Sequence, residues 1–313
     1  MARAELTCPP CIMIHKLLSP YDIDSIDNRS DERVALADRW LGGPVSRYFR
    51  AEVTGIENVP SGPALFVGNH NAGTMNPEAY ILAHALFQRF GTREVPYGLG
   101  HEWAISLPGI NHFLVPLGAV RAGHDTARRL FQRGHKVIVY PGSDLDAMRP
   151  FRMRNRIVFG DRTGFVRLAL RENVPLVPVV AAGAHAVFRV LNEGKRTARW
   201  LGIDKLLRIK AWPLVLSLPW GLTFGPPLLF LPFPSRILVE VLPAIHLDPS
   251  GPDAAKDEAH VRRCADHVLH TMQRSLDALV ERRSQRQDLR VEPESREPQR
   301  TQKAQKESGL VRR

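Results

Sequence analysis

One histidine stands where an apolar strand is expected to end. The stretch ALFVGNHNAG, which begins at Ala64, runs from buried-type residues into Asn69, His70 and a loop that contains Gly73. A histidine at the carboxyl end of a strand can take a proton from a hydroxyl group if a partner holds its other ring nitrogen. A carboxylate is the usual partner, and Glu78 follows eight residues later. The spacing therefore predicts a general base, His70, with Glu78 as its acidic partner.

A second group of polar residues follows another apolar strand. The stretch VIVYPGSDLDAMRPF leads into the turn Pro141, Gly142 and Ser143, and then into Asp146 and Arg149. Backbone N–H groups around Gly142 could hold an oxyanion or a phosphate oxygen, and Arg149 could pair with phosphate. A third strand, VPLVPVV, ends near AAGAH, so three strand ends are expected to converge on one face. Such a convergence of histidine, glycine and arginine favours an active site, in which we assign Asn69 and Gly73 to substrate binding.

The elements that must position these residues alternate along the chain. Hydrophobic periodicity predicts helices at 31–41, 76–90, 125–133 and 164–172, with Asn76 as the cap of the second, and apolar strands between them. A helix past Asp253, with apolar residues at helical spacing from Val261 to Leu279, closes the pattern. Alternating helices and strands predict an α/β fold with a largely parallel, mixed central sheet that is covered by helices on both faces.

Composition divides the 313 residues into three parts. We expect an irregular segment at 1–30, a folded domain at 31–281 and a disordered basic tail at 282–313, which holds ten Lys/Arg and five Asp/Glu and so contributes +5 of the net charge of +11. The remaining positive charge suits nucleic acid, an anionic membrane surface or a polyanionic substrate.

Three cysteines exclude a disulfide framework, and Cys8 and Cys11 have no second ligand pair for a metal. The beginning of the sequence has no apolar signal-peptide core, which predicts a cytoplasmic protein.

One segment departs from the alternation. Residues 211–235 carry no charge and are long enough to span a bilayer by count. They also contain six prolines, and each interior proline costs a helix about 3 kcal/mol, so a straight membrane helix is not expected. Two interpretations remain open: a buried irregular connection, or an apolar surface with Trp212 and Trp220 that enters a membrane interface.

The blocks VGNHNAG, YPGSDLDAMRPF and GFVRLALRENVPLVPVVAAGAH resemble, in order and spacing, the lysophospholipid acyltransferase family, in particular its branch related to monoacylglycerol and diacylglycerol acyltransferases. The resemblance covers about Tyr48 to Pro243. It implies acyl transfer from acyl-coenzyme A to a lipid hydroxyl at a membrane surface, with no further cofactor. It also implies that His70 is the general base, that the turn at Pro141 shapes the substrate site, and that Arg121 contacts the phosphate of the acceptor.

Two positions depart from the family pattern. The family usually places an aspartate after four intervening residues, but here that position is Met75, so either Glu78 or Asp146 could serve as the partner of His70. Ser143 stands where a second glycine would be typical and is expected to narrow the pocket. A non-catalytic lipid-binding protein of the same fold and an acyl-coenzyme A thioesterase are the alternatives. Nucleic-acid binding is not expected, because the folded part lacks a recognition helix of clustered Arg/Lys with interleaved aromatics.

Overall fold

The centre of the computed structural model is a seven-stranded sheet. Its strands are β1 (Glu52–Thr54), β2 (Leu65–Gly68), β3 (Tyr97–Gly100), β4 (Ala119–Arg121), β5 (Val137–Val139), β6 (Leu176–Ala182) and β10 (Leu238–Val241). They lie in the order β1-β10-β6-β2-β5-β3-β4, and all neighbours are parallel except β10 and β6. The predicted mixed, largely parallel sheet is therefore confirmed. The structure describes residues 21–71, 73, 75–192, 194, 213–225 and 230–288.

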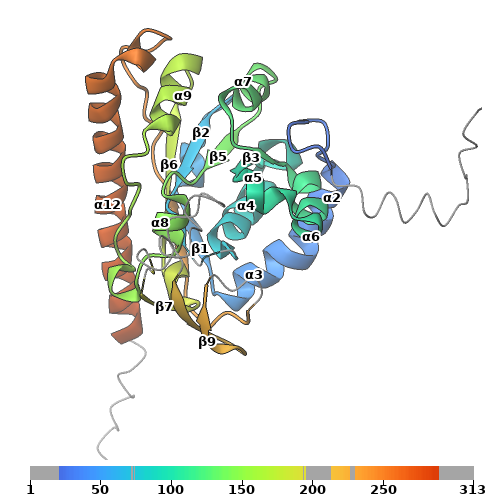
Figure 1. Ribbon diagram of the computed structural model, residues 1–313, viewed down its shortest axis with the longest axis vertical. Helices are drawn as coiled ribbons and strands as arrows, with labels where there is room; N and C mark the ends of the chain where they lie inside the picture. The colour runs from blue at the N-terminus through green and yellow to red at the C-terminus, as the bar shows by residue number, and fades with distance from the viewer. Residues whose placement is uncertain are drawn as a thin grey trace, which may run out of the picture.

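Helices cover both faces of this sheet (Figure 1). On one face lies α4 (Pro77–Phe90), with α2 (Asp31–Ala37) and α3 (Gly43–Tyr48) outside it; on the other lie α7 (His124–Gln132), α9 (Gly164–Glu172) and α12 (Glu258–Asp288). The strand β2 shows why both faces are apolar. Phe66 packs with the α4 side, while Leu65 and Val67 belong to the core shared with α9 and α12. Three short helices complete this part: α5 (Glu102–Ser106), α6 (Pro108–Leu114) and α8 (Ser143–Ala147).

The predicted helices are present, with differences at their ends. α9 begins and ends at the expected residues, and the apolar stripe of α12 is buried, from Val261 to Leu279. Asn76 takes a left-handed backbone conformation (φ 44°) and its side chain makes no cap hydrogen bond with α4, contrary to expectation. α12 continues to Asp288, so residues 282–288 are helical and not part of a disordered tail. The rest of that tail and residues 1–20, with Cys8 and Cys11, lie outside the described residues.

The proline-rich segment 211–235 contains a β-hairpin that the sequence analysis missed. β7 (Arg189–Asn192), β8 (Leu214–Ser217) and β9 (Gly221–Phe224) form a second, antiparallel sheet. The sequence did not indicate this hairpin, because its strands are apolar on both faces and show no alternation of apolar and polar residues: Val215 is buried, while Leu222 is 61% exposed. Trp212 lies outside the described residues. No helix in the described part of the chain is both long and apolar enough to cross a bilayer.

Candidate active site

His70 lies two residues after the end of β2, at the carboxyl edge of the sheet where β2, β5 and β6 lie side by side. Its Nδ1 atom lies 3.2 Å from the carbonyl oxygen of Asn71. In the neutral ring this contact places the proton on Nδ1 and leaves a lone pair on Nε2, the form that a general base requires. The ring stands beside Tyr140, with 5.1 Å between the ring centroids, and lines the wall of a cavity.

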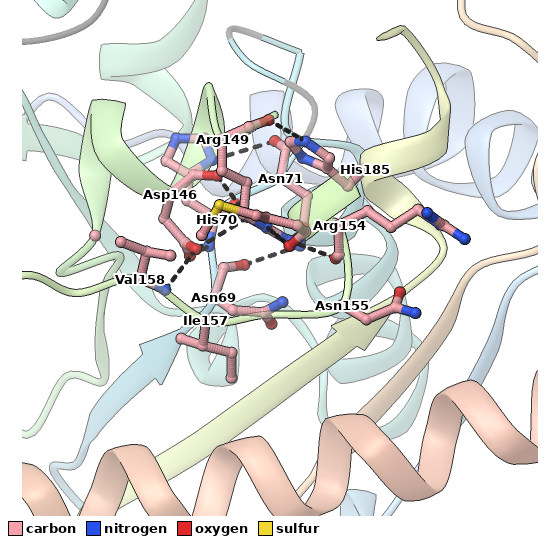
Figure 2. A network of polar contacts seen from close by, with 12 residues as sticks. Asn69, His70, Asn71, Asp146, Arg149, Arg154, Asn155, Ile157, Val158 and His185 are labelled. Carbon is pink, nitrogen blue, oxygen red and sulfur yellow. Dashed lines mark hydrogen bonds and ion pairs between the residues drawn. The ribbon is translucent and has the colours of Figure 1, made fainter. Parts of the chain in front are cut away.

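The backbone of His70 is clamped by two buried charges from α8 and the turn after it. The His70 N–H donates to Oδ2 of Asp146 at 2.6 Å, and the guanidinium of Arg149 donates to the His70 carbonyl at 2.8 Å. Figure 2 shows Arg149 lying between Asp146, Asn71 and His185. Because Asp146 and Arg149 also pair with each other at 2.9 Å, one ion pair holds both polar groups of the His70 backbone.

Asn71 extends this clamp. Its N–H donates to Oε1 of Glu78 at 2.7 Å, and its side chain accepts from Arg149 and donates to the carbonyl of Asn69. Since the Asn71 carbonyl accepts from the His70 ring, the His70–Asn71 pair has all its backbone N–H and C=O groups engaged. Because its backbone is already fixed, His70 loses little conformational entropy when a substrate binds.

The two carboxylates therefore do something other than expected. Glu78 and Asp146 both bond the backbone of the His70–Asn71 turn, and the ring nitrogen is held by a carbonyl oxygen instead of a carboxylate. Burial also raises the pKa of Glu78 to about 8, so at pH 7 it is mainly the neutral acid and supplies little negative charge. Among the described residues, its Oε2 atom has no hydrogen-bond partner. The predicted orientation of the imidazole by Glu78 or Asp146 is corrected to positioning of its backbone.

Asp146 keeps its charge at neutral pH. Burial raises its pKa to about 6, while the Arg149 guanidinium and the N–H groups of Val158 and His70 favour the carboxylate. Burial lowers the pKa of the His70 imidazole to about 4. The hydrogen bond with the Asn71 carbonyl favours the protonated ring and offsets only part of this effect. At pH 7 the ring is therefore neutral and ready to accept a proton.

Two arginines predicted to bind phosphate form ion pairs with carboxylates, Arg149 in the interior and Arg121 at the surface. Arg149 is 1% exposed and donates to six oxygen atoms, on His70, Asn71, Asp146, Met153 and Arg154. Arg121 forms a forked pair with Asp24, at 2.8 and 2.6 Å, and lies 3.7 Å from Glu102. Arg149 is therefore closed off from a ligand. The Arg121 side chain is 42% exposed in its pair with Asp24, so its contact with a phosphate stays a prediction.

Asn69 also has a structural role in place of the expected substrate contact. Its side chain donates to the carbonyl of Ala181 at 3.0 Å and accepts from the Ala181 N–H at 2.8 Å. The amide thus imitates one residue of a β-ladder and ties the end of β2 to β6. Gly73 does line the cavity: its φ is +56°, and a Cβ there would lie 2.9 Å from the terminal carbon of Met148.

The turn at Pro141 forms the wall of the cavity opposite α4. Pro141 and Ser143 line it, and a Cβ on Gly142 would lie 2.3 Å from Asp146 and 2.5 Å from the Val158 carbonyl oxygen. Ser143 has a φ of +44°, a left-handed conformation that explains why glycine would be typical there. Its N–H donates to the Tyr140 carbonyl at 3.0 Å, so this donor is used in the turn and not for an oxyanion.

Three residues at the site were missed by the sequence analysis. Arg162 lines the cavity, pairs with Asp144 at 2.7 Å and donates to the carbonyl oxygens of Pro141 and Gly142. Tyr140 stacks beside the catalytic candidate, and His185 donates to the Arg149 carbonyl at 2.7 Å. Burial lowers the pKa of His185 to about 3, which keeps it neutral. Of these three, only His185, which ends the third sequence block quoted above, was indicated by the sequence, because it follows a strand as His70 does.

The cavity itself has a volume of about 850 Å³. It extends from His70 and the Pro141 turn along α4 to the π-helical turn η1 (Asp38–Gly42), and reaches β3, β4 and α6 on its other sides. Most of its lining is apolar, as in Leu82, Phe87, Ile105 and Leu114. A cavity with a largely apolar lining and the His70 imidazole in its wall suits a lipid whose reacting group meets His70.

Comparison with known proteins assigns this region. Residues 50–182 match the family model described as Acyltransferase, and this stretch includes His70, Glu78, Asp146 and Arg149. The matched region is an acyltransferase-family domain. The resemblance of the sequence blocks to an acyltransferase family is confirmed for this region.

Relatives come from bacteria and vertebrates. An uncharacterized protein of Mycobacterium tuberculosis is 30% identical over 221 residues, which cover 68% of this chain and 62% of that protein. The human protein named DGAT1/2-independent enzyme synthesizing storage lipids is 28% identical over 170 residues, which cover 54% of this chain and 50% of that protein. The alignments thus span between half and two thirds of these relatives. A crystal structure of the 1-acyl-sn-glycerophosphate acyltransferase PlsC from Thermotoga maritima covers 78% of this chain and 82% of that chain, at 15% identity and a TM-score of 0.46.

Proposed function

We propose that this acyltransferase-family chain transfers a fatty acyl group from acyl-coenzyme A to a hydroxyl of a lysophospholipid or other glycerolipid. The observation that carries the proposal is the state of His70. Its ring lines the cavity, Nδ1 is tied to the Asn71 carbonyl, and the low pKa keeps the ring neutral at pH 7. The family of residues 50–182 and the apolar cavity support it.

The reaction follows from this geometry. Nε2 of His70 takes the proton of the acceptor hydroxyl while the hydroxyl oxygen attacks the thioester carbonyl. The tetrahedral intermediate collapses, the carbon–sulfur bond breaks, and the coenzyme A thiolate leaves with the proton that His70 returns. The Asn71 carbonyl, which accepts from Nδ1–H, stabilises the imidazolium between these steps. Arg162 contributes the positive charge nearest to the Pro141 turn.

The test is the substitution His70→Ala in a thiol-release and acyl-transfer assay. We expect a loss of activity of at least about 100-fold, the usual contribution of a general base, with an unchanged unfolding midpoint. Ala substitution of His135, a histidine outside the cavity wall, is the matched control. Retained turnover in His70→Ala would dismiss the base. Thiol release without a lipid acceptor would identify a thioesterase, and lipid binding without thiol release a non-catalytic protein.

The same proposal includes peripheral contact with an anionic membrane surface. The outer face of the β8–β9 hairpin carries exposed apolar side chains, with Leu216 paired opposite Leu222 and Phe224 beside them. Trp220, at the tip, is 60% exposed. A sheet that meets water on one face normally alternates apolar and polar residues, and this one does not. An exposed apolar face with a tryptophan suits the interface of a bilayer.

Basic residues flank this hairpin. Arg189 on β7 pairs in register with Leu216, and its guanidinium lies 4.6 Å from the Phe151 ring, as does that of Arg154. Arg283 lies near the C-terminal end of α12. Burial is the main cause of its lowered pKa, and the nearby charges of Arg154, Arg236 and Arg50 lower that pKa further. Each basic residue near an anionic surface contributes about 1 kcal/mol of attraction.

A further inference from the structure

The ring of Tyr140 lies on the same side of the sheet as the strand residues that lead to His70. β2 and β5 are parallel neighbours, and Phe66 of β2 lies opposite Ile138 of β5. Both of these side chains belong to the core on the α4 side. Because side chains alternate along a strand, Gly68 and Tyr140, two residues later, come to this same side. Tyr140 packs against that core, and its ring centroid lies 5.1 Å from that of the His70 imidazole.

Gly68 makes room for the aromatic ring. A Cβ on Gly68 would lie 2.4 Å from Cε1 and 2.8 Å from Cδ1 of Tyr140. Carbon atoms that are in contact lie about 3.5–4.0 Å apart, so any side chain at this position would push the ring away. Gly68 belongs to a strand and does not have a positive φ, so the backbone itself would accept another residue. Glycine is therefore required here by the close approach of the Tyr140 ring.

The contact with Tyr140 acts on a part of His70 that the backbone clamp does not hold. Asp146 and Arg149 bind the N–H and C=O groups of His70, and these bonds leave its side-chain torsions free. The imidazole itself contacts the Asn71 carbonyl at 3.2 Å, the long end of the usual range of about 2.7–3.2 Å. The two rings meet at an interplanar angle of 47°, at a separation where aromatic rings attract each other. The Tyr140 ring therefore restricts the rotation of the imidazole.

The Tyr140 ring also contributes to the burial of the imidazole. Burial is the largest cause of the low pKa of His70; the charge of Arg149 lowers this pKa further, and that of Asp144 raises it. His185, the other imidazole close by, is neutral, because burial lowers its own pKa to about 3. Removal of the ring would let water reach the face of the imidazole that Tyr140 covers, while these charges would stay in place.

We propose that Tyr140 is a positioning residue for the general base: its ring holds the His70 imidazole in the orientation that presents Nε2 to the acceptor hydroxyl, and Gly68 lets the ring lie there. The inference rests on the proposed acyl transfer and deepens it. The contact is made by the ring and not by the hydroxyl, so phenylalanine can replace Tyr140 and alanine cannot. A displacement of about 1 Å in a reacting group can lower a rate about 100-fold.

The kinetic test separates turnover from substrate binding. In Tyr140→Ala we expect kcat to fall at least about tenfold, with KM for both substrates within about twofold of the wild type, whereas Tyr140→Phe should behave as the wild type does. Gly68→Ala should also lower kcat, because its Cβ displaces the ring while Tyr140 and His70 are unchanged. Gly109→Ala, at a glycine whose Cβ would have no atom within 4 Å, is the matched control and should keep the wild-type kcat.

The protonation state of His70 gives a readout that does not depend on activity. Its nitrogen chemical shifts at pH 5 are assigned by comparison with His70→Ala. The ring should be neutral in the wild type and in Tyr140→Phe, because its pKa is about 4, and protonated in Tyr140→Ala, where contact with water brings the pKa back toward about 6.5. Tyr21→Ala is the control: it removes a tyrosine ring that lies 5.7 Å from the His112 ring, outside the cavity wall, and should leave the His70 signals unchanged.

Four results would overturn the inference. They are a wild-type kcat in Tyr140→Ala, a wild-type kcat in Gly68→Ala, a loss confined to KM, which would make Tyr140 a substrate contact, and an equal loss of kcat in Tyr140→Phe, which would assign the role to the hydroxyl. If Tyr140→Ala does not fold, Gly68→Ala decides in its place. If the wild type transfers no acyl group, the proposed function fails, and the chemical shifts decide alone: a protonated ring in Tyr140→Ala supports the contact, and a neutral ring overturns it.

Discussion

At the scale of single residues, the imidazole of His70 combines low basicity with a fixed backbone. Burial is the main reason for its low pKa, and the nearby Arg149 charge adds to it. A base with a low pKa is weak, but it is present in its neutral form over a wide pH range. The clamp by Asp146, Arg149 and Glu78 offsets the weakness by holding the ring where an acceptor hydroxyl can reach it.

This state of His70 predicts the pH dependence of the reaction. The ring loses its function when it is protonated, so activity should fall as the pH drops through the folded-state pKa of about 4, and not near 6.5. We expect kcat/KM, measured with acyl-coenzyme A and a fixed acceptor, to be flat from pH 7 down to the pKa of Asp146 at about 6, where the clamp begins to loosen, and to be lost completely only as the ring is protonated near 4. Circular dichroism at each pH serves as the control for unfolding. A limb centred near 6.5 would show that the ring is solvated, which contradicts the proposed environment.

At the scale of elements, the segment after β5, which holds Asp146 and Arg149, shows how much of the structure could be predicted from the sequence. The larger helices, the mixed and largely parallel sheet, and the place of His70 after a strand were predictable, because apolar periodicity and strand ends are local signals. The partners of Asp146 and Arg149 were not. Their spacing of three residues fits an exposed helical pair as well as a buried one, and burial depends on contacts with His70, 76 and 79 residues away.

The buried Arg149 in this segment predicts a large effect of its substitution on the free energy of unfolding. Arg149→Lys keeps the charge but loses the planar fork that donates to six oxygens. An ammonium has three donors, so at least three of these oxygens lose their donor in a dry site. We expect about 3 kcal/mol of lost unfolding free energy, measured by urea denaturation. Arg152→Lys, a neighbouring exposed arginine, should change it by less than about 0.5 kcal/mol. A similar small change in Arg149→Lys would mean that water or side-chain rearrangement replaces the fork.

At the scale of the whole molecule, the cavity and the hairpin belong to different parts of one layered fold. The cavity lies between the carboxyl edge of the sheet, α4 and η1. The second sheet and the C-terminal end of α12 lie together at one end of the molecule, next to α3 (Figure 1). The Tyr48 hydroxyl, on α3, donates to the Pro232 carbonyl at 2.7 Å and so ties α3 to a residue that follows the hairpin. An apolar face, its arginines and a lipid-sized cavity are thus carried by one rigid frame.

This arrangement predicts how the protein meets a membrane. Leu222→Ser together with Trp220→Ser removes two exposed apolar side chains from the hairpin, at 61% and 60% exposure, without touching the buried face. Full burial of such a side chain contributes about 1.5–3 kcal/mol, so binding to vesicles should weaken at least about tenfold. Cosedimentation with vesicles of phosphatidylcholine and phosphatidylglycerol measures it, and added salt should weaken wild-type binding further by screening the arginines. Phe90→Ser, an exposed apolar residue at the end of α4, is the matched control and should bind as the wild type does. Equal binding by all three proteins would remove the hairpin from the membrane contact and leave its outer face for another partner.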